Sequence, residues 1–169
     1  MGSFRPGELR PVLHRILDWV PAALSVLMVA LESTATMSAE NTSHWLYPMW
    51  VRLFGPISAE NWAEVHHLIR KTGHFVGYGV VSLTFFYSWR QTLRRAAVQH
   101  WTVWRRASVL AIVCTVLIAS LDEYHQSFLP GRTSSVFDVG IDLCGAMVFQ
   151  LVLLMTLQWL SRRPGLRAA

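Results

Sequence analysis

The chain has 169 residues, of which 53% are apolar and 15% charged, with a mean hydropathy of +0.34. Soluble domains average about 45–50% apolar and about 25% charged residues, so this composition does not fit an ordinary soluble domain. The net charge of +5 comes from basic residues between long apolar blocks. There they act as topology signals and contact anionic lipid headgroups, and we expect no nucleic-acid partner.

Four apolar segments approach the length of about 20 residues that a helix needs to cross a bilayer. They cover residues 13–31, 71–89, 107–126 and 136–160. Asp18 and Pro21 interrupt the first, and the third is long enough only if it continues through the polar residues 122–126. The sequence therefore predicts an all-α polytopic membrane bundle with about four transmembrane helices, forming one domain over residues 1–169.

The distribution of Lys and Arg among the connections predicts the orientation. The N-terminal arm, the second link and the C-terminal tail carry eleven of these residues, whereas the first and third links carry four. Positive residues favour the cytoplasmic side of a membrane protein. We therefore expect both termini in the cytoplasm and the first and third links outside.

The first outer link, residues 32–70, is long and rich in aromatic side chains that favour the membrane–water interface. These are Trp45, Tyr47, Trp50, Phe54 and Trp62. Ser58 can cap a short helix that begins near Ala59, with Glu60 in its first turn. We expect the link to lie on the outer surface as a partial cover.

The second segment carries Lys71, His74 and Tyr78 at positions i, i+3 and i+7, which lie on one face of a helix. Small residues among them let neighbouring helices approach closely; these are Gly73, Gly77 and Gly79. Lys71 can simply extend to the interface and Tyr78 can belong to an aromatic belt. An ionisable His within a membrane segment, however, is a functional candidate.

The third segment ends in Asp122-Glu123-Tyr124-His125-Gln126. Asp122 and Gln126 share a helix face at i, i+4, and Glu123 lies about a quarter-turn away. Adjacent carboxylates at the end of a membrane helix are costly unless they are paired or hydrated. A solvated helix end is the simpler alternative.

A turn signal, Pro130-Gly131, follows and leads directly to Arg132. This arginine lies on the outer side, where the inside-positive bias would not place it. Its rigid donor fork suits a carboxylate or a phosphate. We expect Arg132 either to pair with Asp122 or Glu123 or to bind an anionic headgroup, and the sequence leaves both open.

The fourth segment places Asp138, Asp142 and Gly145 on one face at i, i+4 and i+7. A carboxylate facing lipid would be expensive, so both should face the bundle interior, toward the basic residues described above. Antiparallel topology brings the start of the second segment, the end of the third and the start of the fourth together. The sequence therefore predicts one polar cluster beneath the external surface.

These residues resemble the motifs of the VanZ-like family of small bacterial membrane proteins, over about residues 62–160. The resemblance rests on Lys71-x-x-His74-Phe75-x-x-Tyr78, Asp122-Glu123-x-x-Gln126, Pro130-Gly131-Arg132, Asp138 and Gly145. Two residues depart from the family pattern. Asp142 stands where Asn is usual, which can alter charge balance or ion binding. Phe149 stands where Gly is frequent, which implies looser helix packing or a repacked neighbour.

The resemblance implies an envelope role in the bacterial cytoplasmic membrane. The founding member of the family is associated with low-level resistance to glycopeptide antibiotics of the teicoplanin type. The resemblance does not imply a particular reaction, so it leaves open whether the chain is an enzyme.

Three functions remain open from sequence. In the first, the protein acts on or binds a lipid or lipid-linked headgroup at the outer leaflet. Lys71 and Arg132 would hold a phosphate, and His74, Asp122 or Glu123 would act as general acid or base. The further candidates for ligand contact are Tyr78, Gln126 and Asp138. A divalent metal is an additional alternative, with candidate ligands Asp122, Glu123, His125 and Asp138.

The second function is a non-enzymatic envelope protein that binds a lipid or a partner and whose buried charges form a structural network. The third is a small ion-coupled transporter, because charges within membrane spans often mark transport pathways. Against a transporter, no inverted repeat is visible and the charges lie at one side of the membrane. The sequence does not reveal the oligomeric state.

Overall fold

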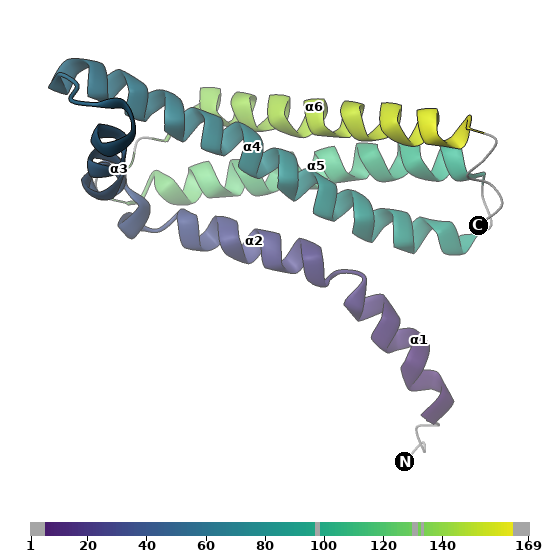
Figure 1. The fold of residues 1–169 in the computed structure, drawn as a ribbon. Coiled ribbons are helices and arrows are strands. Elements are labelled where there is room, and N and C mark those ends of the chain that lie inside the picture. The colour runs from purple at the N-terminus through teal and green to yellow at the C-terminus, as the bar shows by residue number, and fades with distance from the viewer. Residues whose placement is uncertain (1–5, 97–98, 130–131, 133, 164–169) are drawn as a thin grey trace, which may run out of the picture.

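The computed structural model describes residues 6–96, 99–129, 132 and 134–163, which contain helices and no strand. The α-helices are α1 (Pro6–Leu17), α2 (Val20–Glu32), α3 (Ala39–Phe54), α4 (Ala59–Leu93), α5 (His100–Gln126) and α6 (Val136–Ser161). Two short 3-10 turns, Ala35–Met37 and Arg94–Ala96, lie in the connections. Figure 1 shows α4, α5 and α6 side by side, with α2 along the bundle and α1 diverging from it. The predicted all-α membrane bundle is confirmed.

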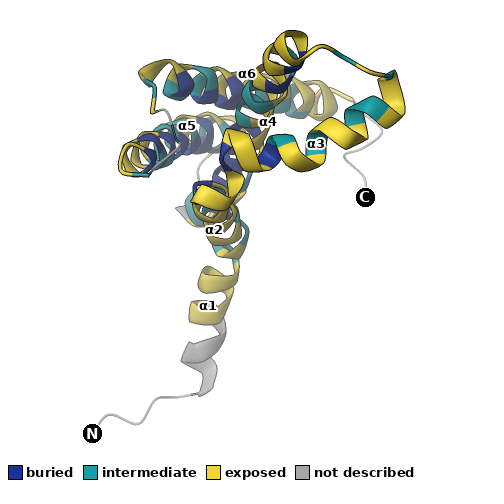
Figure 2. Ribbon diagram, turned by 90° about the vertical axis from the view of Figure 1, so that its left-hand side faces the viewer, coloured by how far each residue is buried: buried dark blue, intermediate teal, exposed yellow. Residues whose placement is uncertain are grey.

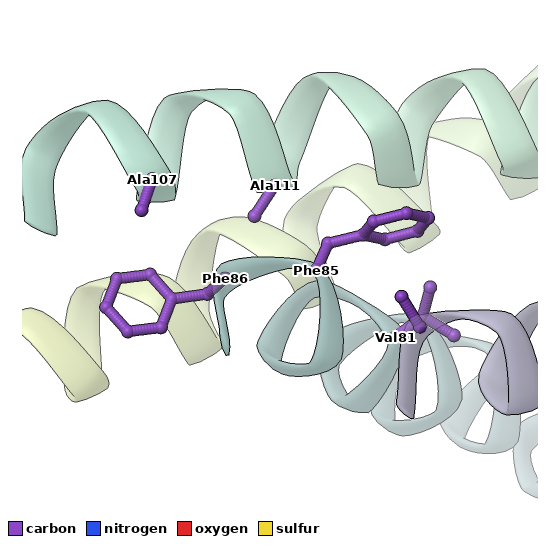
Figure 3. Close-up of a cluster of buried hydrophobic side chains, with 6 residues drawn as sticks. Val81, Phe85, Phe86, Ala107 and Ala111 are labelled. Atoms are coloured by element: carbon purple, nitrogen blue, oxygen red, sulfur yellow. The ribbon is translucent and has the colours of Figure 1, made fainter. Parts of the chain in front are cut away.

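The long helix α4 is the centre of this bundle, because it packs against α2, α5 and α6. Its apolar core includes Phe85 and Phe86, which pack near the fully buried Ala107 and Ala111 of α5. Figure 3 shows the two alanines pointing from α5 toward α4, where the phenylalanines lie. Small side chains on one helix thus make room for large rings on the other.

Within the described residues, three helical stretches are long and apolar enough to cross a membrane: Val12–Glu32, His100–Gln126 and Val136–Ser161. They correspond to the first, third and fourth predicted segments, although α5 begins seven residues before residue 107. The second predicted segment, 71–89, does not reach that apolarity. It is part of the longer helix α4, whose polar residues and glycines lower its hydropathy. Because α4 lies among three other helices, protein rather than lipid covers much of its surface.

The first predicted segment is divided rather than continuous. Helix α1 ends at Leu17, and α2 begins at Val20 with Pro21 in its first turn. Proline has no N–H to continue the preceding turn, so the helix breaks there. Asp18, at the break, accepts a 2.5 Å hydrogen bond from Arg95. This pairing lies at the far end of the bundle from the predicted polar cluster.

The first outer link contains a helix, α3, that the sequence analysis missed. Ser38 caps its N-terminus by accepting a 3.3 Å hydrogen bond from the Asn41 N–H. Gly55 follows its C-terminus with a φ of 90°, a conformation that favours glycine. Pro48 lies inside the helix. Because proline is unfavourable in a helix interior, the sequence alone indicates a loop at this position. Figure 2 shows α3 crossing the end of the bundle.

Ser58 caps the following helix as predicted, accepting a 3.3 Å hydrogen bond from Asn61 N–H. That helix continues without a break into the second predicted segment, and the two together form α4. The Thr42 hydroxyl and His66 Nε2 lie 3.1 Å apart and tie α3 to this outer part of α4. The link therefore forms a helical cover over one end of the bundle.

Candidate functional site

Two charged or polar pairs join α4 to α6 where the sequence predicted a cluster. Lys71 Nζ forms an ion pair with Asp138, and His74 Nδ1 lies 3.2 Å from Asp142 Oδ1. The two α4 residues are one turn apart, as are the two aspartates on α6, so the pairs stack along the helix interface. Asp142 is only 1% exposed, which confirms that the α6 carboxylates face the bundle interior.

A third contact joins α4 to α5. The Tyr78 hydroxyl donates a 2.8 Å hydrogen bond to Asp122 Oδ2, and Gln126 Nε2 donates one of 3.0 Å to the same oxygen. Tyr78 and Gln126 are each 4% exposed. The predicted shared face of Asp122 and Gln126 is thus confirmed. The polar face of α4 therefore meets α5 and α6 within the same end of the bundle.

Glu123 fastens the start of α6 to the end of α5. It is 4% exposed, and its Oε2 accepts a 2.8 Å hydrogen bond from the Ser135 N–H. Its Oε1 is buried without a hydrogen-bond partner among the described residues, as are Asp122 Oδ1 and Asp142 Oδ2. A buried carboxylate oxygen without a donor is costly. These three oxygens therefore favour a protonated carboxyl group or a further hydrogen-bond donor.

Arg132 does not pair with Asp122 or Glu123, so that alternative was wrong. Its Nη2 donates to the backbone carbonyl of Glu32 and, over 2.8 Å, to that of Thr34. Carbonyls at the end of a helix lack partners and attract cations. Arg132 therefore caps the C-terminus of α2, while the adjacent Pro130-Gly131 turn lies outside the described residues.

Removing this cap should loosen the connection between α2 and α3. Replacing Arg132 with Gln takes away a cation at a helix C-terminus, which is worth about 1 kcal/mol. Hydrogen exchange of the amides at residues 33–38 is therefore expected to become several-fold faster, with the α5 amides unchanged. Unaltered exchange at residues 33–38 would show that Arg132 does not hold this corner.

The candidate metal ligands do not assemble. The His125 imidazole turns toward α2, where its Nδ1 lies 2.9 Å from the Ser33 hydroxyl. In the part of the chain that the structure describes, no group of three or more His, Cys, Asp or Glu side chains could hold a metal ion. The predicted set of Asp122, Glu123, His125 and Asp138 therefore does not fit a metal centre.

Arg70 belongs to this end of the bundle, although the sequence analysis counted it only as a loop charge. Its Nη1 donates a 3.0 Å hydrogen bond to the Met37 carbonyl. Burial, and then the neighbouring charge of Arg70, lower the pKa of Arg132. Arg70 and Arg132 thus lie near each other, and each donates to backbone carbonyls of the α2–α3 corner. The second predicted segment began at Lys71, whereas α4 already includes Arg70. Extending the predicted helix toward its N-terminus would have added Arg70 to the polar cluster.

In the comparison with family models, residues 17–158 match the model described as VanZ/LLP1. The chain belongs to the VanZ/LLP1 family. The comparisons with curated proteins and with solved structures returned no match. The polar cluster lies entirely within the region that matches the family model. The predicted resemblance is therefore confirmed.

In this VanZ/LLP1 protein, a close contact between α4 and α6 sets the geometry of the cluster. A Cβ atom at Gly145 would lie 2.1 Å from the Phe75 carbonyl oxygen, so only glycine fits there. Phe149 occupies the space that a Cβ at Gly79 would need, with the nearest ring atom 2.6 Å away. Phe149, which departs from the family pattern, therefore packs closely against α4, because Gly79 leaves room for its ring. The alternative of looser helix packing was wrong.

An apolar groove runs along the surface between α4 and α6, next to the ion pairs. It is lined by Phe75, Val136, Phe137, Gly140, Ile141 and Cys144. Phe75 lies one turn after Lys71 on α4, and Phe137 precedes Asp138 on α6. The groove therefore begins beside the Lys71–Asp138 pair. Cys144 is exposed in this groove.

Proposed function

We propose that this VanZ/LLP1-family protein binds the phosphate-containing headgroup of a lipid or lipid-linked precursor at the outer leaflet of the bacterial cytoplasmic membrane. The observation that carries this proposal is the position of the Lys71–Asp138 pair beside the apolar α4–α6 groove. An acyl or prenyl chain suits the groove, and a phosphate suits the lysine. The excess of Lys and Arg in the alternate connections supports an outward position for this end of the bundle.

Lys71 has the donors and the access that this role requires. An ammonium group has three N–H donors, and Asp138 occupies one of them. The Lys71 side chain is 26% exposed, whereas the Asp138 side chain is 10% exposed. A phosphate that arrives from the groove can therefore bind the lysine without displacing the aspartate.

Two arginines increase the positive charge around this position. Arg70 and Arg132 donate to backbone carbonyls, and no ion pair between either of them and an acidic side chain is present among the described residues. The carboxylates of Asp138, near Arg70, and of Asp122 and Glu123, near Arg132, offset part of these charges. A phosphate bound at Lys71 would experience the charges of both arginines at short range.

The proposal is tested by lipid binding to the purified protein. Lys71→Gln should lower the affinity for polyprenyl phosphate about tenfold or more, because a hydrogen bond to a charged group contributes about 1.5–3 kcal/mol. Native mass spectrometry of the full chain, titrated with polyprenyl phosphate, measures the change. Lys71→Arg should retain most of the affinity.

The matched control is Arg52→Gln, which removes one positive charge from the exposed surface of α3. Its affinity should remain within about twofold of the unmodified chain, since exposed charges contribute little. If Lys71→Gln binds polyprenyl phosphate as tightly as the unmodified chain and melts at the same temperature, the proposed site is wrong.

One observation supports a catalytic version of this function. The imidazole of His74 is oriented by Asp142, an arrangement that general acid–base catalysis uses. Its side chain is 18% exposed, close to the proposed phosphate position. Release of phosphate or alcohol from a bound lipid by the unmodified chain, but not by His74→Gln, would support catalysis. Whether the protein only binds the lipid or also acts on it, we propose that it works in the cell envelope and contributes to low-level glycopeptide resistance.

A further inference from the structure

A second pocket lies between α3 and the outer part of α4, with a volume of about 480 Å³. Small-molecule sites typically occupy about 300–1,000 Å³. Trp62, which lines the pocket, and Lys71 are nine residues apart on α4. Nine residues are about two and a half turns, so the two side chains point to opposite sides of the helix. The pocket is therefore separate from the proposed lipid site. Its polar and aromatic lining residues are Glu40, Ser43, His44, Tyr47 and Trp62.

The opposite flank of α3 indicates which way this pocket opens. Trp45, Met49 and Leu53 follow one another at i, i+4 and i+8 and are all exposed, so they form an apolar stripe. A helix at the membrane surface buries such a stripe in the interface. Figure 2 shows α3 crossing the end of the bundle, which fits a helix that lies along the surface. At about 100° per residue, the pocket residues of α3 lie on the side away from the stripe, so the pocket opens to headgroups and water.

Two aromatic rings form a corner of the pocket. The rings of Tyr47 and Trp62 have centroids 5.3 Å apart and planes at 71° to each other. Trp62 Nε1 donates a 2.7 Å hydrogen bond to the Ser43 hydroxyl, which holds the indole against α3. Aromatic cages bind quaternary ammonium groups because the ring faces carry partial negative charge. Two rings at this angle offer two walls of such a cage.

A carboxylate lies beside this corner. Glu40 and Tyr47 are seven residues apart on α3, which places them on one face of the helix, separated by about 10 Å along its axis. Glu40 is exposed and makes no ion pair with another described residue. Ser43 and His44 lie in the turn between them and supply further hydrogen-bond acceptors. A small organic cation between Glu40 and the rings would be attracted by both.

The lining favours a cation over an anion or a metal ion. No Lys or Arg is among the described residues that line the pocket, so a phosphate would meet the Glu40 carboxylate and no opposing charge. Calcium and magnesium ions need about six or more oxygen ligands. The described ranges contain no group of three His, Cys, Asp or Glu side chains placed to bind a metal. An organic ammonium group, in contrast, needs only one carboxylate beside ring faces.

The residue behind the Trp62 ring does not oppose a cation. His66 stacks on this ring with centroids 5.4 Å apart. Burial, followed by the charges of Arg70 and His67, lowers the pKa of His66. Because an ordinary histidine already titrates near pH 6.5, the imidazole is neutral at pH 7. It therefore adds no positive charge next to the aromatic corner.

We infer that the α3–α4 pocket binds an organic ammonium group, such as the choline headgroup of a lipid or a free quaternary amine. The juxtaposition that carries this inference is the Tyr47–Trp62 corner beside the exposed Glu40 carboxylate. The site is independent of the phosphate proposed at Lys71. It gives α3 a binding role of its own.

The test compares two probes of nearly the same shape: choline and its neutral isostere 3,3-dimethyl-1-butanol. Saturation-transfer NMR measures the affinity of each probe for the full chain in phosphatidylglycerol nanodiscs, with empty nanodiscs as the blank. Choline should bind about tenfold more tightly, because only the cation gains from the ring faces and the carboxylate. Equal affinities for the two probes would overturn the inference.

Variants of the lining assign the binding to the pocket. Tyr47→Leu removes a ring face but keeps an apolar side chain, and it should weaken choline binding about fivefold. Glu40→Gln removes the charge at nearly constant shape and should weaken it about threefold, as expected for an exposed charge. Both should leave the affinity for the neutral alcohol within about twofold. Tyr47→Phe keeps the ring and should bind choline nearly as well as the unmodified chain.

Matched controls separate the pocket from its surroundings. Trp45→Leu removes a ring from the opposite flank of α3, and Glu64→Gln removes an exposed carboxylate of α4 that does not line the pocket. Both should bind choline like the unmodified chain. Circular dichroism and the melting temperature in detergent should show that all variants keep their helices. Unchanged choline binding in Tyr47→Leu, or an equal loss in Trp45→Leu, would contradict the site.

Lys71→Gln separates this inference from the proposed function. It should weaken the binding of polyprenyl phosphate and leave the binding of choline unchanged, because the two sites lie on opposite sides of α4. Loss of choline binding in Lys71→Gln would show that choline does not occupy the α3–α4 pocket. The two proposals therefore fail in distinguishable ways.

A lipid arm identifies the source of the ammonium group. If a choline headgroup reaches the pocket, nanodiscs of mixed phosphatidylcholine and phosphatidylglycerol should lower the apparent affinity for free choline. An unchanged affinity identifies a soluble cation as the ligand, and either result supports an ammonium site. Tighter binding of glucose than of choline would instead identify a sugar site and overturn the inference.

Discussion

Gly145→Ala is expected to destabilise the helical bundle by about 1–3 kcal/mol, the range typical of overpacked cores. The added methyl group would lie 2.1 Å from the Phe75 carbonyl oxygen. That oxygen belongs to the backbone of α4, so no side-chain rotation can relieve the contact. Alanine improves helix propensity by about 1 kcal/mol relative to glycine, which offsets only part of the cost.

Separation of α4 and α6 would also lengthen the Lys71–Asp138 and His74–Asp142 contacts. Gly145→Ala should therefore lower both the melting temperature in mild detergent and the affinity for polyprenyl phosphate. Gly140→Ala is the matched control for stability, since it lies on the same helix and no atom lies within 4 Å of its added Cβ. Equal melting temperatures for the two variants would show that α4 and α6 do not depend on the close approach.

His74→Leu is expected to cost about 3 kcal/mol of stability, because it leaves the carboxylate of Asp142 buried without its partner. Asp142 is 1% exposed, so water cannot replace the imidazole without opening the bundle. The free energy of unfolding, measured by denaturant titration in mixed micelles, should fall accordingly. Replacing both members of the pair, as His74→Leu with Asp142→Leu, should recover most of the loss.

This double-mutant cycle also distinguishes a structural network from a catalytic one. In a purely structural network, the double variant regains stability and lipid binding together. A catalytic role for His74 predicts that the double variant folds and binds lipid but releases no product. A single variant as stable as the unmodified chain would show that the pair contributes little to the fold.

Several features of the site could be predicted because they depend only on helical periodicity and on the order of the apolar segments. Spacings of three, four and seven residues place Lys71, His74 and Tyr78 on one helix face in any regular α-helix. Antiparallel connection of α4, α5 and α6 then brings Glu123 and Asp142 to the same end as this face. The sequence could predict the polar cluster for these reasons, and it could predict the resemblance that the VanZ/LLP1 match confirms.

Other contacts depend on how the helices rotate and tilt against each other, which periodicity does not determine. Arg132 donates to the α2 carbonyls and not to Asp122 because α2 ends beside the loop before α6. Gln150 was missed as well. It accepts a 2.5 Å hydrogen bond from Ser108 and donates one of 2.9 Å to the Ser82 carbonyl, so it links three helices.

The sequence by itself determined that the chain is a helical membrane bundle with ionisable residues gathered at one end, because composition and local spacing carry that information. Only the tertiary structure decided which carboxylate meets which base, that α3 is a helix crossing the bundle end despite Pro48, and that the candidate metal ligands stay apart. The pairing of α4 with α6 follows from their close approach at Gly145, since a contact between residues seventy positions apart sets the helix rotation.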